Sequence, residues 1–208
     1  MATIMETCPI NISTKLFHVE NVLVGANYSP EEVKAYTSLF KEFRDVFAWS
    51  YEEMLGIDPS IVEHEIKLYN NSRPVRQKLR PMNPRKASAI KAEVQNLLKA
   101  GFIYPVALTE WVSNLVPVNK KLGAIRVCID FQDLNLACPK DNYPTLFIDQ
   151  IIDECAGNEV FSLMDGFPSY NQIQIKKEDQ HKTNFIYPWG TFAYQKIPFG
   201  LKNAGVTF

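Results

Sequence analysis

Apolar residues recur along this chain with two different periods, and the longer period predicts three helices. The first begins at Ser29-Pro30-Glu31-Glu32, where a serine N-cap, a proline in the first helical position and a glutamate in the third form a capping box. The second begins at Asn83-Pro84 and ends at Gly101, and a shorter third follows Pro144 and ends near Gly157. The apolar faces consist of Val33, Tyr36, Phe40, Phe43 and Phe47 in the first helix, Ala87, Ile90, Val94, Leu97 and Leu98 in the second, and Ile148, Ile151 and Ile152 in the third.

Shorter apolar patterns predict the strands. Ile66 and Leu68 alternate with charged neighbours over residues 63–68, and the apolar run 160–164 is typical of a buried strand. A chain that mixes separate helices with hairpins is typical of an α+β fold. Two hairpins are expected, one joining residues 112–118 to 125–131 through a loop with Gly123, the other joining 185–187 to 192–197 through Pro188-Trp189-Gly190.

Composition and cysteine spacing narrow the class of protein. With 208 residues, of which 46% are hydrophobic and 22% charged, the chain has enough apolar mass for one or two cores. It has no run of eighteen apolar residues that would span a membrane, and its first fifteen residues lack the apolar core of a signal peptide. Its four cysteines form no CxxC pair, so we expect reduced thiols and a protein of the cytoplasm or nucleus, neither secreted nor membrane-bound.

Charge is distributed unevenly, although the formal net charge is only −1. Residues 1–63 carry four basic and ten acidic side chains, residues 64–140 carry thirteen basic and five acidic ones, and residues 141–208 carry five and eight. Within the basic middle, residues 73–86 hold six basic side chains and no acidic one. A solvated basic loop is the commonest meaning of such a run. It is also where a polyanion would bind, because each Lys or Arg that meets a phosphate releases a condensed counterion.

One carboxylate stands where a metal ligand would be expected. Asp165 follows the apolar run 160–164, and the residues after it, from Gly166 to Tyr170, must turn away from that strand. A carboxylate at the exit of a buried strand can hold a divalent cation against a phosphate, although an aspartate in such a place more often caps a turn or a helix. The three histidines show no zinc spacing, and we expect His64 to be a strand residue rather than a ligand.

Four stretches of the sequence are similar to segments of one enzyme family. VFSLMDGFPSYNQIQI and IPFGLKNAG resemble the first two palm motifs of reverse transcriptases from gypsy-type long-terminal-repeat retrotransposons, in the version common in plant elements. WVSNLVPV resembles the first fingers strand of that family, and PVRQKLRPMNP the segment that leads into its fingers. The resemblance covers roughly residues 45–208 and implies the fingers (about 60–155) and an incomplete palm (about 156–208) of a right-hand polymerase, with residues 1–44 as a connector. The aromatic-x-Asp-Asp box of the third palm motif does not occur in the sequence.

The resemblance implies roles for residues around the nucleotide. Asp165 would be a catalytic ligand that bridges two Mg²⁺ ions, with Mn²⁺ as an alternative metal. Lys120 and Arg126, on the two arms of the first hairpin, would grip the incoming triphosphate, with Lys121 as an alternative to Lys120. Tyr170 would lie under the deoxyribose and exclude a 2′-hydroxyl by clash.

The same resemblance places further residues against nucleic acid. Phe199 and Gly200, in the second palm motif, would lie where the backbone approaches the template–nucleotide pair. Arg76, Lys78 and Arg80 would meet template phosphates. The partners implied are therefore an RNA template, a DNA primer and a deoxynucleoside triphosphate, with no membrane.

The implied reaction is template-directed addition of deoxynucleotides to a primer by two-metal phosphoryl transfer, the chemistry of an RNA-directed DNA polymerase. The full element would also encode a protease, an RNase H and an integrase, and would work in a cytoplasmic virus-like particle or in the nucleus. Because two of the three metal carboxylates belong to the third motif, we expect these 208 residues alone to be inactive or nearly so. Two alternatives stay open: a retrotransposon-derived relic that binds nucleic acid without catalysis, and a chain that does not fold stably because its palm sheet lacks the central hairpin.

Overall fold

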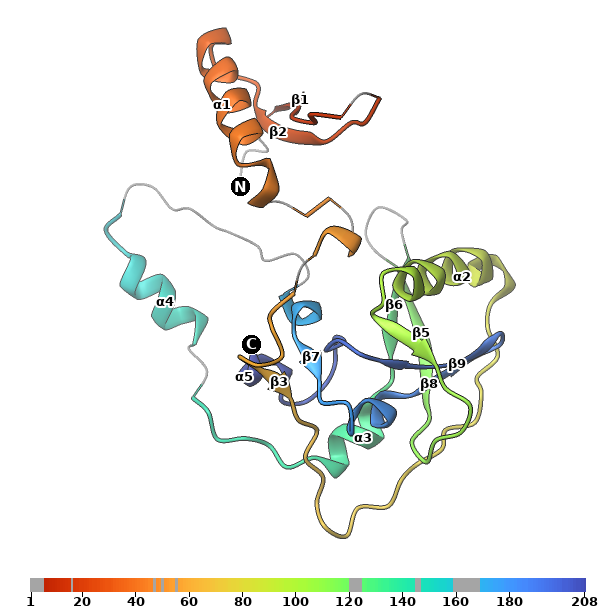
Figure 1. The fold of residues 1–208 in the computed structure, drawn as a ribbon. Helices are drawn as coiled ribbons and strands as arrows, with labels where there is room; N and C mark the ends of the chain where they lie inside the picture. Colours follow the sequence, from red (N-terminus) through yellow and green to blue (C-terminus); the bar gives the residue numbers. More distant parts are fainter. Residues whose placement is uncertain are drawn as a thin grey trace. The chain divides into compact units, whose positions relative to one another are not determined.

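The structure is a computed structural model that describes residues 6–15, 17–46, 48–49, 51–54, 56–119, 125–144, 147–158 and 169–208 (Figure 1). The chain divides into two compact units, Met1–Glu53 and Met54–Phe208. Among the described residues, no helix is both long enough and apolar enough to cross a membrane. The cysteines Cys8, Cys128, Cys138 and Cys155 are all free.

The first unit is a hairpin followed by a helix. Strands β1 (Thr7–Asn11) and β2 (Asn21–Gly25) pair antiparallel, and α1 (Pro30–Glu42) follows, with two short 3₁₀ turns, η1 (Arg44–Val46) and η2 (Tyr51–Glu53). The predicted capping box at the start of α1 is confirmed: the Ser29 hydroxyl accepts from the Glu32 N–H at 3.3 Å, and the Glu32 carboxylate accepts from the Ser29 N–H at 2.8 Å.

The apolar face predicted for α1 finds little to pack against. No residue of the helix is buried; Val33 and Phe40 are half-buried, and Tyr36 is exposed. The apolar residues buried in the described part of this unit are Ile12 and Val24, which lie in and next to the hairpin. Since so small a unit buries little apolar surface, polar contacts must contribute much of what holds the helix to the hairpin.

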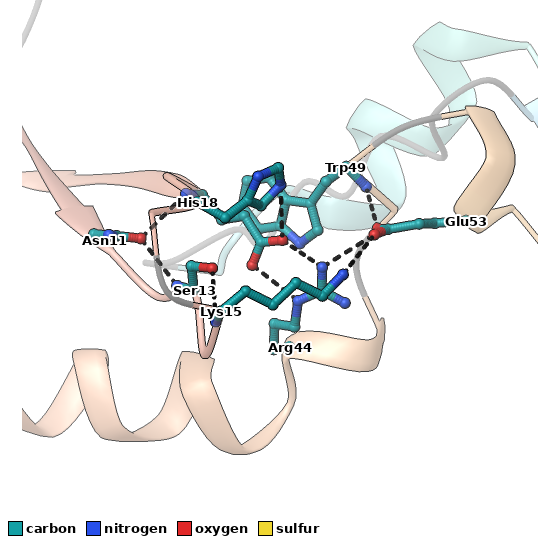
Figure 2. A network of polar contacts seen from close by, with 8 residues as sticks. Asn11, Ser13, Lys15, His18, Arg44, Trp49 and Glu53 are labelled. Carbon is teal, nitrogen blue, oxygen red and sulfur yellow. Dashed lines mark hydrogen bonds and ion pairs between the residues drawn. The ribbon is translucent and has the colours of Figure 1, made fainter.

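The first unit contains a network of polar contacts around the Arg44 guanidinium (Figure 2). Glu20 is only 1% exposed and accepts two hydrogen bonds from the Arg44 guanidinium, one from Nε at 2.9 Å and a shorter one from Nη2. The same guanidinium donates to Glu53 at 3.1 Å, and Glu53 accepts from the Trp49 N–H at 3.1 Å. The hydrogen bonds from Arg44 lower the pKa of Glu20, because they stabilise its charged form.

Replacing Glu20 with Gln should weaken the first unit at neutral pH. The pKa of Glu20 is lowered, so its stabilising effect is present above the ordinary carboxyl value of 4.5 and is lost as the pH falls through the lowered value. We expect α1 amides to exchange faster in Glu20→Gln than in the wild type at pH ~7, with the difference shrinking under acid conditions. Glu31→Gln, an exposed change of the same charge, is the control. Equal α1 exchange in Glu20→Gln and the wild type at pH ~7 would contradict this account.

The second unit is built on a five-stranded sheet (Figure 1). Its order is β4 (Ile103–Pro105), β9 (Gly190–Tyr194), β8 (Phe185–Tyr187), β5 (Ser113–Asn119) and β6 (Ile125–Ile129). The pairs are antiparallel except β5 with β8, which run parallel with Ser113 opposite Phe185. A second, two-stranded sheet pairs β3 (Glu63–His64) with β7 (Gln174–Ile175) in parallel.

Helix α2 (Pro84–Lys99) packs against β4 and β6 and buries Ile90, Val94 and Leu97, which confirms the second predicted helix and most of its apolar face. Leu98, predicted on that face, is 41% exposed. Gly101 adopts a φ of +71°, the left-handed conformation that ends a helix without the strain a side chain would add.

The remaining predictions are met to different degrees. The first hairpin is confirmed as β5 and β6, but the second strand stops at Ile129 because residues 132–137 form a helix, α3 (Gln132–Ala137), that the sequence pattern did not predict. The second hairpin is confirmed, although β9 ends at Tyr194; beyond it, Gln195 and Ile197 hydrogen-bond to Ile175 and Ile173. Only Glu63 and His64 of the predicted strand 63–68 pair as a strand.

The third predicted helix is also present. It is α4 (Ile148–Cys155), and Gly157 follows it with a φ of +98°. Its apolar face is uncovered, because Ile148, Ile151 and Ile152 are all exposed. The predicted strand 160–164 lies outside the described residues.

Candidate nucleotide and nucleic-acid site

Three segments that lie far apart in the sequence meet at a group of aromatic rings. Tyr170, in the 3₁₀ turn η3 (Ser169–Gln172), packs edge-on against Phe199, with ring centroids 5.4 Å apart and planes at 84°. Phe208 packs on Tyr170 in the same way at 5.7 Å. From β6, the guanidinium carbon of Arg126 lies 5.8 Å from the centre of the Phe199 ring, within the range of a cation–π contact. The structure therefore brings together Arg126, Tyr170 and Phe199, which the sequence predicted separately.

Gly200 allows the chain to turn next to this cluster, which we name the aromatic cluster and define as Tyr170, Phe199 and Phe208. The φ of Gly200 is +99°, a backbone conformation that side chains disfavour. A Cβ atom there would stand 3.8 Å from the Phe131 ring and 3.9 Å from the Ile129 carbonyl oxygen, both ordinary contacts. The backbone conformation, rather than lack of space, is what requires glycine at this position.

Asn135 on α3 fixes the turn that carries Phe199 and Gly200. Its amide nitrogen donates to the Gly200 carbonyl at 2.6 Å, and its amide oxygen accepts from the Lys202 N–H at 2.9 Å. The Lys202 ammonium in turn donates to the carbonyls of Asn135 and Cys138 at 3.1 and 2.6 Å, near the end of α3. Sequence reasoning missed Asn135, because nothing in the local pattern shows that its partners lie 65 and 67 residues further along the chain.

The basic segment forms a second surface. Residues 75–77 run alongside the start of β5: the Val112 N–H donates to the Val75 carbonyl at 3.0 Å, and the Gln77 N–H donates to the Val112 carbonyl at 2.9 Å. Gln77 is half-buried, whereas Arg76 and Lys78 on either side of it are exposed. Arg76 and Lys78 therefore face solvent, while the Gln77 side chain between them is directed toward β5.

Asn114, on β5 and only 2% exposed, holds this segment in place. The Gln77 side-chain oxygen accepts from the Asn114 N–H at 2.9 Å and from its amide group at 3.1 Å. The same amide donates to the Lys78 carbonyl at 2.9 Å, and its oxygen accepts from the Arg80 N–H at 3.0 Å. The buried Asn114 side chain thus satisfies the Lys78 carbonyl and the Arg80 N–H, in addition to the backbone pairing of residues 75–77 with Val112.

Arg76, Lys78 and Arg80 form what we call the basic strip. All three are exposed, but they differ in their partners. Arg80 forms an ion pair with Asp130, with Nη2 and Oδ2 2.6 Å apart. Within the described ranges, neither Arg76 nor Lys78 has an acidic partner. The structure therefore leaves two of the three predicted cations unpaired within those ranges.

Other predicted site residues lie outside the part of the chain that the structure describes. Asp165, Lys120 and Lys121 lie outside the described residues. Where the structure does describe the chain, no group of three or more His, Cys, Asp or Glu side chains could hold a metal ion. His64 lies in β3 and is buried, with Nδ1 2.8 Å from the Thr207 hydroxyl, and burial lowers its pKa. It is a strand residue, as expected.

Asn135→Ala should loosen the turn at Phe199 and Gly200. The variant removes two side-chain hydrogen bonds, so we expect a loss of about 1–2 kcal/mol in the free energy of unfolding. Urea unfolding measures this, and Gln132→Ala, an exposed change on the same helix, is the control. If Asn135→Ala and Gln132→Ala unfold at the same urea concentration, the hydrogen bonds of the Asn135 side chain do not stabilise the protein.

Transposon polyproteins are similar in sequence to most of this chain. The chain is 30% identical over 171 residues to the transposon Tf2-3 and Tf2-7 polyproteins of Schizosaccharomyces pombe, which covers 82% of this chain and 13% of each polyprotein. No family model matches. Because the match covers 13% of each polyprotein, the chain spans about an eighth of the length of these relatives.

Solved structures with a similar fold come from foamy virus protease–reverse transcriptase. The prototype foamy virus enzyme matches with a TM-score of 0.69 at 18% identity, covering 86% of this chain and 24% of that one. The enzyme in complex with double-stranded DNA matches at 0.68 and 22%, covering 88% and 38%. The complex with an RNA/DNA hybrid matches at 0.61 and 19%, covering 86% and 24%. At these identities the match establishes a shared mixed α/β fold.

Proposed function

Because this chain is homologous to a segment of retrotransposon Pol polyproteins, we propose that it forms the fingers and the first part of the palm of a gypsy-type reverse transcriptase. In this proposal residues 1–44 are a connector, the fingers extend over about 60–155 and the palm begins at about 156. The enzyme would be an RNA-directed DNA polymerase, a nucleotidyltransferase that extends a DNA primer on an RNA template.

The observation that carries the proposal is the meeting of Arg126, Tyr170 and Phe199 around the Gly200 turn. The resemblance assigned each of them to the incoming nucleotide from a different motif, and the fold brings them to one place. Arg126 presents a planar guanidinium group whose N–H donors match the geometry of a phosphate. Its guanidinium carbon lies 5.8 Å from the centre of the Phe199 ring, so the aromatic face favours this position of the charge. Tyr170, braced between two rings, would exclude a 2′-hydroxyl by bulk rather than by attraction.

The metal part of the proposal rests on Asp165 alone. Two Mg²⁺ ions, when bound, would activate the primer 3′-hydroxyl and stabilise the leaving pyrophosphate. Asp165 lies outside the described residues, and the described ones offer no group of carboxylates that would complete the site. Asp165 is therefore the one metal ligand that we propose for this chain.

The basic strip is the proposed contact with template phosphates. Arg76 and Lys78 are exposed on a segment whose backbone is held to β5, so the backbone loses little freedom when the two side chains meet a polyanion. Structures of the foamy virus enzyme contain double-stranded DNA and an RNA/DNA hybrid, which supports the same class of partner here.

Arg126→Ala should weaken the binding of a deoxynucleoside triphosphate to the chain–primer–template complex. Hydrogen bonds between charged groups contribute about 1.5–3 kcal/mol each, so we expect a loss of roughly tenfold or more, and a smaller loss in Arg126→Lys, which keeps the charge without the fork. Fluorescence titration with a labelled nucleotide measures this. Arg73→Ala, the same change in an exposed arginine of the basic run, is the control. Equal affinities in the Arg126 and Arg73 variants would remove Arg126 from the site.

We also expect residues 1–208 alone to extend a primer weakly or not at all, because one metal carboxylate cannot hold two ions. A primer-extension assay on an RNA template, with Mg²⁺ and then with Mn²⁺, tests this. Robust extension that Asp165→Ala abolishes would refute the claim of inactivity and would at the same time establish Asp165 as catalytic.

The exposed cations of the basic strip favour a second function, binding of nucleic acid without catalysis. In that case binding to an RNA–DNA hybrid would survive Asp165→Ala and weaken with salt. Neutralising Arg76 and Lys78 to Gln should reduce the slope of log K against log[salt] by about 0.9 for each phosphate that the variant no longer neutralises. Lys34→Gln with Lys41→Gln, an equal loss of charge on α1, is the control. Equal changes of the salt slope in the Arg76/Lys78 variant and in the Lys34/Lys41 variant would argue against phosphate binding at the basic strip.

A further inference from the structure

We propose that Asp130 acts as an internal competitor for Arg80, which it holds in the free protein and gives up to a nucleic-acid phosphate. Asp130 thereby limits how tightly the basic strip grips its template. This inference rests on the proposed binding of nucleic acid to the strip, and it adds a specific residue that sets the strength of that binding.

The position of both partners is set before any ligand binds. The Arg80 N–H donates to the side-chain oxygen of Asn114 at 3.0 Å, and the Asp130 N–H donates to the backbone carbonyl of Asn114 at 2.9 Å. Both backbones are therefore anchored on the same buried residue. The 2.6 Å contact between Arg80 Nη2 and Asp130 Oδ2 follows from that placement.

The pair is arranged so that the arginine, rather than the aspartate, is free to leave. The Arg80 side chain is 56% exposed, whereas that of Asp130 is 18% exposed. Asp130 also uses its second oxygen, which accepts from the Gln132 N–H at 3.3 Å at the start of α3. When a phosphate approaches, the long side chain of Arg80 can swing to it while the carboxylate stays in place.

Arg80 gains free energy when it exchanges Asp130 for a nucleic-acid phosphate, but part of that gain is lost. An exposed ion pair contributes little to stability, so it is readily opened. A phosphate on a polynucleotide adds the release of condensed counterions, which a single carboxylate cannot offer. The carboxylate left behind then repels the phosphate that has replaced it. Arg80 should therefore contribute less to binding than Lys78, which has no acidic partner among the described residues.

Such a competitor suits a protein that must release one phosphate and take the next as its template advances. A strip of three unopposed cations would hold each register more tightly. A cation that can return to Asp130 between phosphates would shorten the time spent in each register.

The test is a salt titration of the chain on an RNA–DNA hybrid with five variants, one of them Lys78→Gln. Asp130→Asn keeps an oxygen for the Gln132 N–H but removes the charge that competes for Arg80, so we expect binding about three- to fivefold tighter. The salt slope should stay about the same, because Arg80 neutralises one phosphate in both proteins. Glu110→Gln, an equal loss of charge at an exposed carboxylate of the same unit, is the matched control. Arg80→Gln and the double variant Asp130→Asn/Arg80→Gln complete the cycle.

If Asp130 competes for Arg80, the tighter binding that Asp130→Asn causes should disappear in the double variant. The same competition also predicts, without relying on any Asp130 variant, that Arg80→Gln costs less affinity than Lys78→Gln in the wild-type background. Equal gains from Asp130→Asn and Glu110→Gln would overturn the inference, since general charge would then explain both. A gain that persists without Arg80 would overturn it as well. If the wild type does not bind the hybrid at all, the proposed function fails first and this inference fails with it.

Discussion

The hydrogen bonds of Asn114 are the interaction on which the proposed nucleic-acid surface depends. Asn114 is buried on the interior strand β5, between β8 and β6, and its backbone and amide groups contact Gln77, Lys78, Arg80 and Asp130. A buried amide is costly unless its donors and acceptors are satisfied, and here the basic segment satisfies them. The same bonds therefore stabilise the sheet interior and give the segment one fixed conformation.

The corner between β6 and α3 connects the two parts of the candidate site. Asp130 and Asp133, at the start of α3, hold Arg80 and Gln77 of the basic segment. Asn135, further along the same helix, holds the turn that carries Phe199 and Gly200. A helix of six residues thus supports both the basic strip and the aromatic cluster. Changes in this helix would be felt at both surfaces, since its side chains hydrogen-bond to each of them.

Local patterns in the sequence were sufficient for the elements whose signals are short-range. The capping box at Ser29, the helix from Pro84 and the hairpin turn at Trp189 each depend on residues a few positions apart, and all are confirmed. The parallel pairing of β5 with β8 joins residues 72 positions apart, Ser113 and Phe185, and no local pattern reveals it. Helix α3 was missed for a related reason: it is only six residues long, and its polar side chains hydrogen-bond to Gln77 and Gly200, which lie 56 and 65 positions away.

The residues of the candidate site divide in the same way, into those that sequence motifs predict and those that only long-range contacts reveal. Resemblance to a family supplied Arg126, Tyr170, Phe199 and Gly200, and the fold brings these together, but Asn114, Asp130 and Asn135 could be found only from their contacts. The assignment of the aromatic cluster to the incoming nucleotide is the central claim, and photocrosslinking tests it most directly. We would irradiate the chain, bound to primer–template, with a 5-iodo-deoxyuridine triphosphate and map the adduct by mass spectrometry. The account predicts an adduct on Tyr170 or Phe199 that excess unlabelled nucleotide suppresses; adducts confined to other residues would contradict it.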